Sequence, residues 1–384
     1  MLSCQKYLFD LPDDVSYLNC AYMGPLLKQS EAIGQHEIKK RLRPFQYSKD
    51  DFFNPVEDLK ANFSKLINGD DSQRIALIPA ASYGIANAAR NVNCSKGQNV
   101  LIIGEQFPSN YYTWKQLADE KGATIKIVSA PESPENRTET WNQNILDNID
   151  EQTAVVAMPI VHWADGTLFD LKSIRKRSSE VGAALIIDGT QSIGALPFDM
   201  DDVQPDALIC GAYKWMFGPY GMGIAYYGPL FDKGTPIEDN WINRKGSEQF
   251  ENLVNYQSEY KPKAARYAVG ENSNFIYVPM LNASIKQLLE WQPTRIQDYC
   301  KNLVSPYLSA FQSLGCTVGS ESSMAFHLFG IRMPEGIDIL KLKTQFEKEN
   351  VFISIRGNAI RVAPNVYNEK KDMEALLRCL KQAL

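Results

Sequence analysis

Two residues of opposite charge, Asp188 and Lys214, follow two short apolar runs in the middle of the chain. The run 183–187 has the length and residue types of a buried strand, and it ends on Asp188 followed by Gly189. The run 207–210 precedes Lys214 by a few residues. Ligands of open α/β sheets bind at the carboxyl ends of the strands. Two neighbouring strands are therefore expected to present an acid and an amine side by side.

An acid beside an amine suits pyridoxal phosphate (PLP). The amine of Lys214 would form a Schiff base with the aldehyde, and Asp188 would keep the pyridine nitrogen protonated. Gln191 is placed to reach the ring hydroxyl. Taken singly, a strand ending in Asp-Gly is typical of a turn, and a lysine among aromatic residues is typical of a surface. The joint pattern, completed by the glycine-rich turn 218–223, is more specific.

This pattern resembles the class V aminotransferase family of PLP enzymes, which includes cysteine desulfurases, kynureninases and isopenicillin N epimerase. The resemblance covers nearly the whole chain and rests most on Asp188, Gln191 and Lys214. It implies the PLP-dependent transferase fold, an α/β large domain with a mostly parallel sheet between helices, plus a smaller α+β C-terminal domain. It also implies that Lys214 and Asp188 are catalytic.

Further cofactor contacts are expected on three other segments. Small residues open a helix at Ala81 and Ser82, where free backbone N–H groups suit a phosphate, and the resembled enzymes hold the PLP phosphate there. Phe107 follows a strand and is the candidate to stack on the ring. The resemblance adds Tyr213 as a phosphate ligand and places Trp163 beside the cofactor.

The substrate contacts are expected near both ends of the chain. The segment 360–368 resembles the one that supplies this family's carboxylate-binding arginine, a role that falls on Arg361. Arg356 is a second candidate, and for either residue the alternative is an arginine on a surface strand. The N-terminal segment with Ala21 and Tyr22 resembles one that passes close to the substrate. An α-amino acid is therefore the expected substrate.

The sequence leaves several reactions open. Desulfurases carry a nucleophilic cysteine between two C-terminal arginine-bearing segments, and residues 357–360 hold none, which disfavours cysteine desulfuration. An aminotransferase-like reaction is the first expectation, with isopenicillin N epimerase-like racemisation or a kynureninase-like or β-elimination lyase as alternatives. All begin with an external aldimine and removal of the α-proton by Lys214. A PLP-binding regulatory module is the non-enzymatic alternative, and a nucleotide-binding oxidoreductase is opposed by the missing dinucleotide fingerprint.

Composition narrows the partners. The 384 residues have 44% hydrophobic and 22% charged residues and a net charge of −5, which gives no electrostatic footprint for nucleic acid or an anionic membrane. No apolar run has transmembrane length, so a cytoplasmic protein is expected. The seven cysteines show no CxxC spacing and the three histidines are not paired, so no metal site is expected.

Strands alternate with helices over residues 70–230 and indicate a sheet covered on both faces. The polar stretch 229–263 is the expected boundary, which predicts a large PLP-binding domain at 15–258 and a small domain at 259–384, with residues 1–14 packing on the latter. The turn 266–275, with Gly270 and Glu271, resembles one that crosses a dimer interface, so a homodimer is expected.

Overall fold

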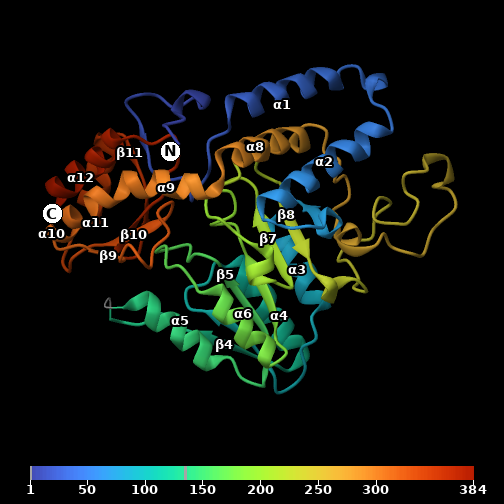
Figure 1. Ribbon diagram of the computed structural model, residues 1–384, viewed down its shortest axis with the longest axis horizontal. Helices are drawn as coiled ribbons and strands as arrows, with labels where there is room; N and C mark the ends of the chain where they lie inside the picture. Colours follow the sequence, from blue (N-terminus) through green and yellow to red (C-terminus); the bar gives the residue numbers. More distant parts are fainter. Residues whose placement is uncertain (1, 134–135) are drawn as a thin grey trace.

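The computed structural model describes residues 2–133 and 136–384 and contains a central seven-stranded sheet (Figure 1). The strand order is β2-β8-β7-β6-β5-β3-β4. β3 to β7 pair in parallel, whereas β8 is antiparallel to both β7 and β2. The mostly parallel sheet expected from the sequence is thus confirmed. The strands are β2 (Ile75–Ile78), β3 (Asn99–Ile103), β4 (Thr124–Val128), β5 (Thr153–Pro159), β6 (Ala184–Asp188), β7 (Ala207–Gly211) and β8 (Gly223–Tyr227).

Apolar residues cover both faces of this sheet because successive strand residues point to opposite sides. In β3, Val100 and Ile102 join one buried cluster, and Leu101 and Ile103 join the other. Parallel strands buried on both faces read as continuous apolar runs, which is how they were recognisable in the sequence. Helices α3 (Ala81–Asn91) and α4 (Ser109–Lys121) contribute to the first cluster. The second cluster includes residues of α2 (Asp50–Leu66), α5 (Arg137–Asn148), α6 (Leu171–Glu180) and α8 (Tyr277–Trp291).

The C-terminal part forms a separate antiparallel sheet of four strands, in the order β12-β13-β10-β9. The N-terminal strand β1 (Ser16–Tyr17) pairs with β11 (Val351–Phe352), and both chain ends lie at this end of the molecule in Figure 1. This agrees with the expected smaller α+β part. Its elements are β9 (Thr317–Val318), β10 (Phe329–Arg332), β12 (Ser354–Arg356), β13 (Ala359–Val362), α9 (Pro293–Val304), α10 (Leu308–Ser313), α11 (Ile339–Lys348) and α12 (Lys370–Ala383).

The division at residues 258 and 259 stays a prediction. Residues 229–263 hold short 3₁₀ turns and one isolated bridge between Arg244 and Tyr260. Beyond them, α8 packs on α2 and on α1 (Lys28–Arg41), alongside the central sheet. The N-terminal arm reaches the C-terminal part, where the Gln5 backbone N–H donates to the Val366 carbonyl at 2.7 Å. In the described residues, no helix combines the length and apolarity needed to cross a bilayer.

Candidate active site

A cavity of about 240 Å³ opens at the carboxyl ends of the central parallel strands. Asp188 ends β6, and Lys214 follows β7 in the next connection. Both residues line the cavity, as the sequence predicted from the two apolar runs. Six other residues named from the sequence as cofactor contacts also line it: Ala81, Ser82, Phe107, Trp163, Gln191 and Tyr213.

Lys214 is a buried amine. Only 6% of the residue is exposed, and its Nζ lies 5.6 Å from the ring centre of Phe107 and 5.4 Å from that of Tyr213. Burial and the positive charge of Arg361 lower the pKa of Lys214 to about 8, although Asp188 opposes this shift. About a tenth of this amine is therefore unprotonated at pH 7, and this is the form that attacks a carbonyl or accepts a proton.

Asp188 is partly exposed, and it lines the cavity. Burial raises the pKa of Asp188, while hydrogen bonds from Thr190 and the charge of Lys214 partly counter the shift. The Thr190 backbone N–H donates to Asp188 Oδ1 at 3.0 Å and fixes the carboxyl group. A buried carboxyl group of this kind favours a cationic partner, because a cation compensates the cost of ionising it.

Gln191 is held by contacts at both ends of its amide. Trp215 Nε1 donates to Gln191 Oε1 at 3.1 Å, and Gln191 Nε2 donates to the Ala21 carbonyl at 3.2 Å. His327 packs edge-on against Trp215 and contacts the Gln191 carbonyl through Nε2 at 2.8 Å. The Gln191 amide nitrogen carries two hydrogens, and the Ala21 carbonyl accepts one of them. One hydrogen is therefore still free to donate.

The N-terminus of α3 supplies backbone donors to the cavity. Ala81 and Ser82 are the first residues of this helix, so their N–H groups have no acceptor in a preceding turn. The helix sits close to β7, because a side chain at Gly84 would come within 2.8 Å of Ile209. Free N–H groups at the positive end of a helix fit a phosphate, which is the group that the sequence placed here.

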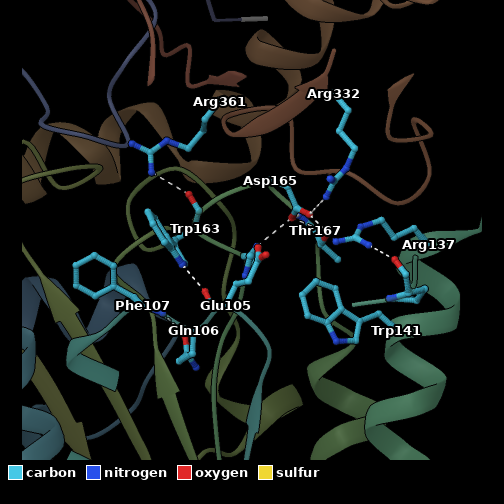
Figure 2. A network of polar contacts seen from close by, with 12 residues as sticks. Glu105, Gln106, Phe107, Arg137, Trp141, Trp163, Asp165, Thr167, Arg332 and Arg361 are labelled. Carbon is cyan, nitrogen blue, oxygen red and sulfur yellow. Dashed lines mark hydrogen bonds and ion pairs between the residues drawn. The ribbon is translucent and has the colours of Figure 1, made fainter. Parts of the chain in front are cut away.

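Aromatic side chains form one wall of the cavity. Phe107 and Trp163 meet edge to face with ring centres 5.5 Å apart, and Trp163 Nε1 donates to the Glu105 carbonyl at 2.7 Å (Figure 2). Both rings lie near Lys214 and Tyr213 in the lining. His162, next to Trp163, is fully buried, and its Nδ1 contacts Asp165 Oδ1 at 3.1 Å.

Arg361 contacts this wall at the Trp163 carbonyl and its charge acts on Lys214, although the residue does not line the cavity. Its residue is only 2% exposed, and it donates from Nη1 to the Trp163 carbonyl at 2.8 Å and from Nη2 to Ser354 Oγ at 3.2 Å. Its Nε has no partner, and within residues 2–133 and 136–384 it forms no ion pair. Burial, together with Arg356, lowers the pKa of Arg361 to about 10. The guanidinium is thus a buried charge without an acid.

The other residues named as substrate contacts lie on a neighbouring side. Arg356 and Tyr22 line a second cavity of about 600 Å³ between the N-terminal segment and the β11–β12 region. The Arg356 guanidinium lies 5.2 Å from the ring centre of Trp163, which belongs to the first cavity. Tyr22 is 60% exposed, whereas Ala21 is buried and contacts Gln191 only through its carbonyl.

A cluster of charges beside Trp163, to its right in Figure 2, was not foreseen. Asp165 is within 3.1 Å of Arg137 Nη2, 3.2 Å of Arg332 Nη2 and 3.1 Å of His162 Nδ1. It also accepts hydrogen bonds from the backbone and hydroxyl of Thr167. Although burial alone would raise it, the contacts with His162, Thr167 and Arg137 hold the pKa of Asp165 well below its usual range.

Other lining residues were missed in the sequence, among them Gln106, Ser109, Thr190 and Tyr220. Thr190 has the clearest role, because its hydroxyl accepts from the Gly211 backbone N–H at 2.9 Å and so ties β6 to β7. Its position between Asp188 and Gln191 was an available signal. Tyr220 packs on Tyr213 with ring centres 4.8 Å apart, a contact that no local pattern announces.

The chain is similar in sequence to a known family and to several of its members. The family model described as Aminotransferase class-V matches residues 42–378. The uncharacterized aminotransferase YcbU of Bacillus subtilis (strain 168) is 24% identical over 322 residues, which are 83% of this chain and 81% of the relative. A cysteine desulfurase of Synechococcus elongatus is 24% identical over 208 residues, 53% of this chain and 32% of that protein.

Solved structures share the fold. The apo cysteine desulfurase of Thermococcus onnurineus NA1 superposes with a TM-score of 0.84 at 15% identity, covering 100% of this chain and 98% of that one. A mutant of C-DES with glycine covalently linked to its PLP cofactor also gives a TM-score of 0.84, at 14% identity, covering 99% and 100%. The expected fold class is thereby confirmed.

Proposed function

Because the chain belongs to the class V aminotransferase family, we propose that it is a PLP-dependent enzyme that acts on an α-amino acid in the manner of an aminotransferase. When bound, PLP supplies an aldehyde that condenses with amines and a ring that accepts electrons from the substrate α-carbon. The observation that carries the proposal is the buried Lys214 amine, which shares a cavity with the buried Asp188 carboxyl group and the open N-terminus of α3.

Each donor in the cavity matches one part of this cofactor. The N–H groups of Ala81 and Ser82, with the Tyr213 hydroxyl, would hold the phosphate. Asp188 would hold the proton of the pyridine nitrogen, since its buried carboxyl group requires a cationic neighbour when ionised. Gln191 Nε2 would donate to the ring oxygen.

The aromatic wall would hold the ring in place. Phe107 would lie against the ring face and Trp163 beside it, because both line the cavity next to Lys214.

Lys214 Nζ is the group that would take the α-proton of the substrate. Its lowered pKa, about 8, keeps part of the amine unprotonated at neutral pH, and the surrounding aromatic rings keep water away from it. The same group would return the proton to the substrate or the product, depending on the reaction.

Arg361 would bind the substrate α-carboxylate. A planar guanidinium holds a carboxylate through two parallel charge-assisted hydrogen bonds, which fixes the bonds at the α-carbon. The absence of any ion pair to Arg361 within the described part of the chain leaves the charge to be matched by a ligand. Trp163 and Ser354 orient the guanidinium without neutralising it.

The hairpin that carries both arginines supports reactions without a protein thiol. Arg356 of β12 pairs with Ala359 of β13, so only Gly357 and Asn358 form the turn, and Gly357 has a left-handed φ of 59°. A turn of this length has no room for a cysteine-bearing loop. Amino transfer, epimerisation and β-elimination need no protein thiol, and amino transfer is the reaction we propose.

We also propose a homodimer, in which the turn at residues 266–275 contacts the partner subunit. Gly270 donates its backbone N–H to Glu238 Oε1 at 2.8 Å, and Glu238 in turn accepts from Tyr83 of α3 at 2.9 Å. The turn is thus fixed next to the helix that would hold the phosphate. Light scattering of the purified holoenzyme is expected to give twice the chain mass, and a fully active monomer would remove this proposal.

The proposed reaction is tested with a panel of amino acids, each incubated with and without α-keto acids. The expected result is that some amino acids change the absorption of the bound cofactor and release about one keto acid per site without an acceptor, whereas repeated turnover and a new amino acid require an α-keto acid. Lys214→Ala should abolish turnover, whereas Lys172→Ala, at an exposed lysine paired with Asp202, should not. Product formation by the Lys214 variant at the parent rate would refute the proposal.

A further inference from the structure

The positive charges of Arg356 and Arg361 repel each other, and neither guanidinium is paired with an acid among the described residues. They stand on the adjacent strands β12 and β13, and the charge of Arg356 contributes to the lowered pKa of Arg361. In the part of the chain that the structure describes, neither forms an ion pair within 4.0 Å. Two facing cations in a partly buried site repel each other and cost stability unless an anion joins them.

Arg356 lines the second cavity and contacts a residue of the first. Its guanidinium lies over Trp163 at 5.2 Å, while the residue itself lines the second cavity together with Tyr22 and Ser354. Its Nη1 donates only to the carbonyl of its own neighbour Ile355 at 2.8 Å, and its Nε is buried without a partner. Most of its hydrogen-bond donors therefore have no partner among the described residues.

Positive charge exceeds negative charge around Arg356 and Arg361. The charges of Arg361 and Arg356 both lower the pKa of Lys214, and Arg356 lowers that of Arg361, whereas the acid Asp188 acts on Lys214. In the second cavity, the acid among the described lining residues is Glu347, which lies 3.7 Å from Lys343 and is matched by it. One α-carboxylate would neutralise one guanidinium and leave the other unmatched.

We propose that the substrate is an amino acid with an acidic side chain, whose distal carboxylate binds Arg356 while its α-carboxylate binds Arg361. This rests on the proposed function, because it requires the substrate to be attached above Lys214. Arg356 suits the role, since its guanidinium is packed against Trp163 and keeps several N–H groups free. An amide of the same shape would leave the guanidinium without an anion, so the site discriminates by charge.

The test compares two pairs of substrates that differ in charge alone, aspartate with asparagine and glutamate with glutamine. In the parent enzyme, kcat/KM is expected to be higher for the acid of at least one pair, by about tenfold or more. Arg356→Gln should remove that preference by lowering kcat/KM for the acid and leaving the amide unchanged. Arg41→Gln, an exposed arginine at the end of α1, is the control and should change neither.

The outcomes separate three positions of the substrate. Equal losses for acid and amide in Arg356→Gln would show that both arginines hold the α-carboxylate, and no change for either would show that Arg356 does not touch the substrate. Both results overturn the proposal, as does a parent enzyme that prefers amides. Inactivity of Lys214→Ala in the same assay, together with any of these results, would leave the proposed function standing.

A binding measurement tests the same claim without turnover. Succinate carries two carboxylates, and succinamate replaces one of them with an amide. Calorimetric titration of the holoenzyme should show succinate binding about tenfold or more tightly than succinamate, and the difference should vanish in Arg356→Gln. Equal affinity for the two compounds in the parent enzyme would contradict the proposal.

Discussion

Two groups of arginines lie near Trp163 and differ in one respect. In the first group, Arg137 and Arg332 hold Asp165, which also receives hydrogen bonds from Thr167 (Figure 2). In the second group, Arg361 and Arg356 have no acid among the described residues. The first group has its negative charge fully surrounded by donors. The second group has positive charge that only neutral acceptors contact.

The difference indicates what each group does. A buried charge with matched partners fixes a segment in place, and here it holds the turn that carries Trp163. A buried charge without a partner is retained against its cost, which is typical of a ligand site. The two groups are joined by Trp163, whose carbonyl accepts from Arg361. The matched group therefore supports the position of the unmatched one.

The largest expected effect is on stability, at the matched group. Asp165→Asn should lower the free energy of unfolding by about 3 to 5 kcal/mol, because it leaves two guanidinium groups without their shared anion. Denaturant unfolding measures this change. Asp119→Asn is the control at an exposed ion pair with Lys115 and should cost less than about 1 kcal/mol. Equal effects of the two substitutions would show that Asp165 is not the centre of a buried network.

Because the pKa of Asp165 is lowered, the contribution of this residue to stability depends on pH. Its folded-state pKa lies below the unfolded value, so its contribution to stability is present above about pH 4 and is lost as the pH falls further. Asp165→Asn should abolish this part of the acid sensitivity. If the parent and Asp165→Asn lost the same free energy of unfolding as the pH falls below about 4, this expectation would be wrong.

Substitution in the unmatched group should affect turnover instead of folding. Arg361→Lys is expected to lose about 1 to 3 kcal/mol of transition-state binding for amino acids, the range of a charged hydrogen bond, while its unfolding free energy falls little. Steady-state kinetics and denaturant unfolding of the same variant give both numbers. If Arg361→Lys and Arg361→Ala turn over amino acids as well as the parent, the carboxylate is held elsewhere.

The amine of Lys214 links the unmatched charge to pH. In the cofactor-free protein its pKa is about 8, against an ordinary 10.5, so the unfolded chain binds more protons between these values. Stability should therefore rise with pH across this window, by about 3 kcal/mol relative to Lys214→Met, and the difference should be constant below about pH 7. Parallel stability curves for the parent and Lys214→Met through this window would contradict the shift.

The smallest effect is expected at the exposed edge of the matched group. The Arg332 side chain is 34% exposed and that of Arg137 is 17% exposed, so water compensates more readily for the loss of Arg332. Arg332→Gln should cost about 1 kcal/mol or less in denaturant unfolding, and less than Arg137→Gln. The reverse order would mean that the link from β10 to Asp165 matters more than the link from α5.

The sequence predicts the residues that line the cavity better than the contacts that hold those residues in place. Asp188 and Lys214 were found because a buried parallel strand is an uninterrupted apolar run and its carboxyl end is where ligands bind. The Asp165 network joins residues from α5, the 160–167 turn and β10, which are far apart in the chain and follow no shared pattern. Contacts of this kind depend on how the elements pack, and packing is not local.

Helix ends show the same limit. Apolar periodicity over residues 293–314 predicts one helix, but α9 ends at Val304 and a 3₁₀ turn, Ser305–Tyr307, precedes α10. Pro306 lies in that turn, and without a backbone N–H it cannot continue the hydrogen-bond pattern of α9. Apolar periodicity alone does not reveal the break, because the proline interrupts the backbone hydrogen bonds and not the spacing of the apolar residues.

The most direct test of the account is to locate the lysine that holds PLP. The holoenzyme is reduced with borohydride, digested, and analysed by mass spectrometry, with Lys214→Ala treated in parallel. The account predicts one modified peptide containing Lys214, and no reducible adduct in the variant even where PLP remains bound. A modified peptide that maps to another lysine, or an adduct retained by Lys214→Ala, would contradict the central role given to this buried amine.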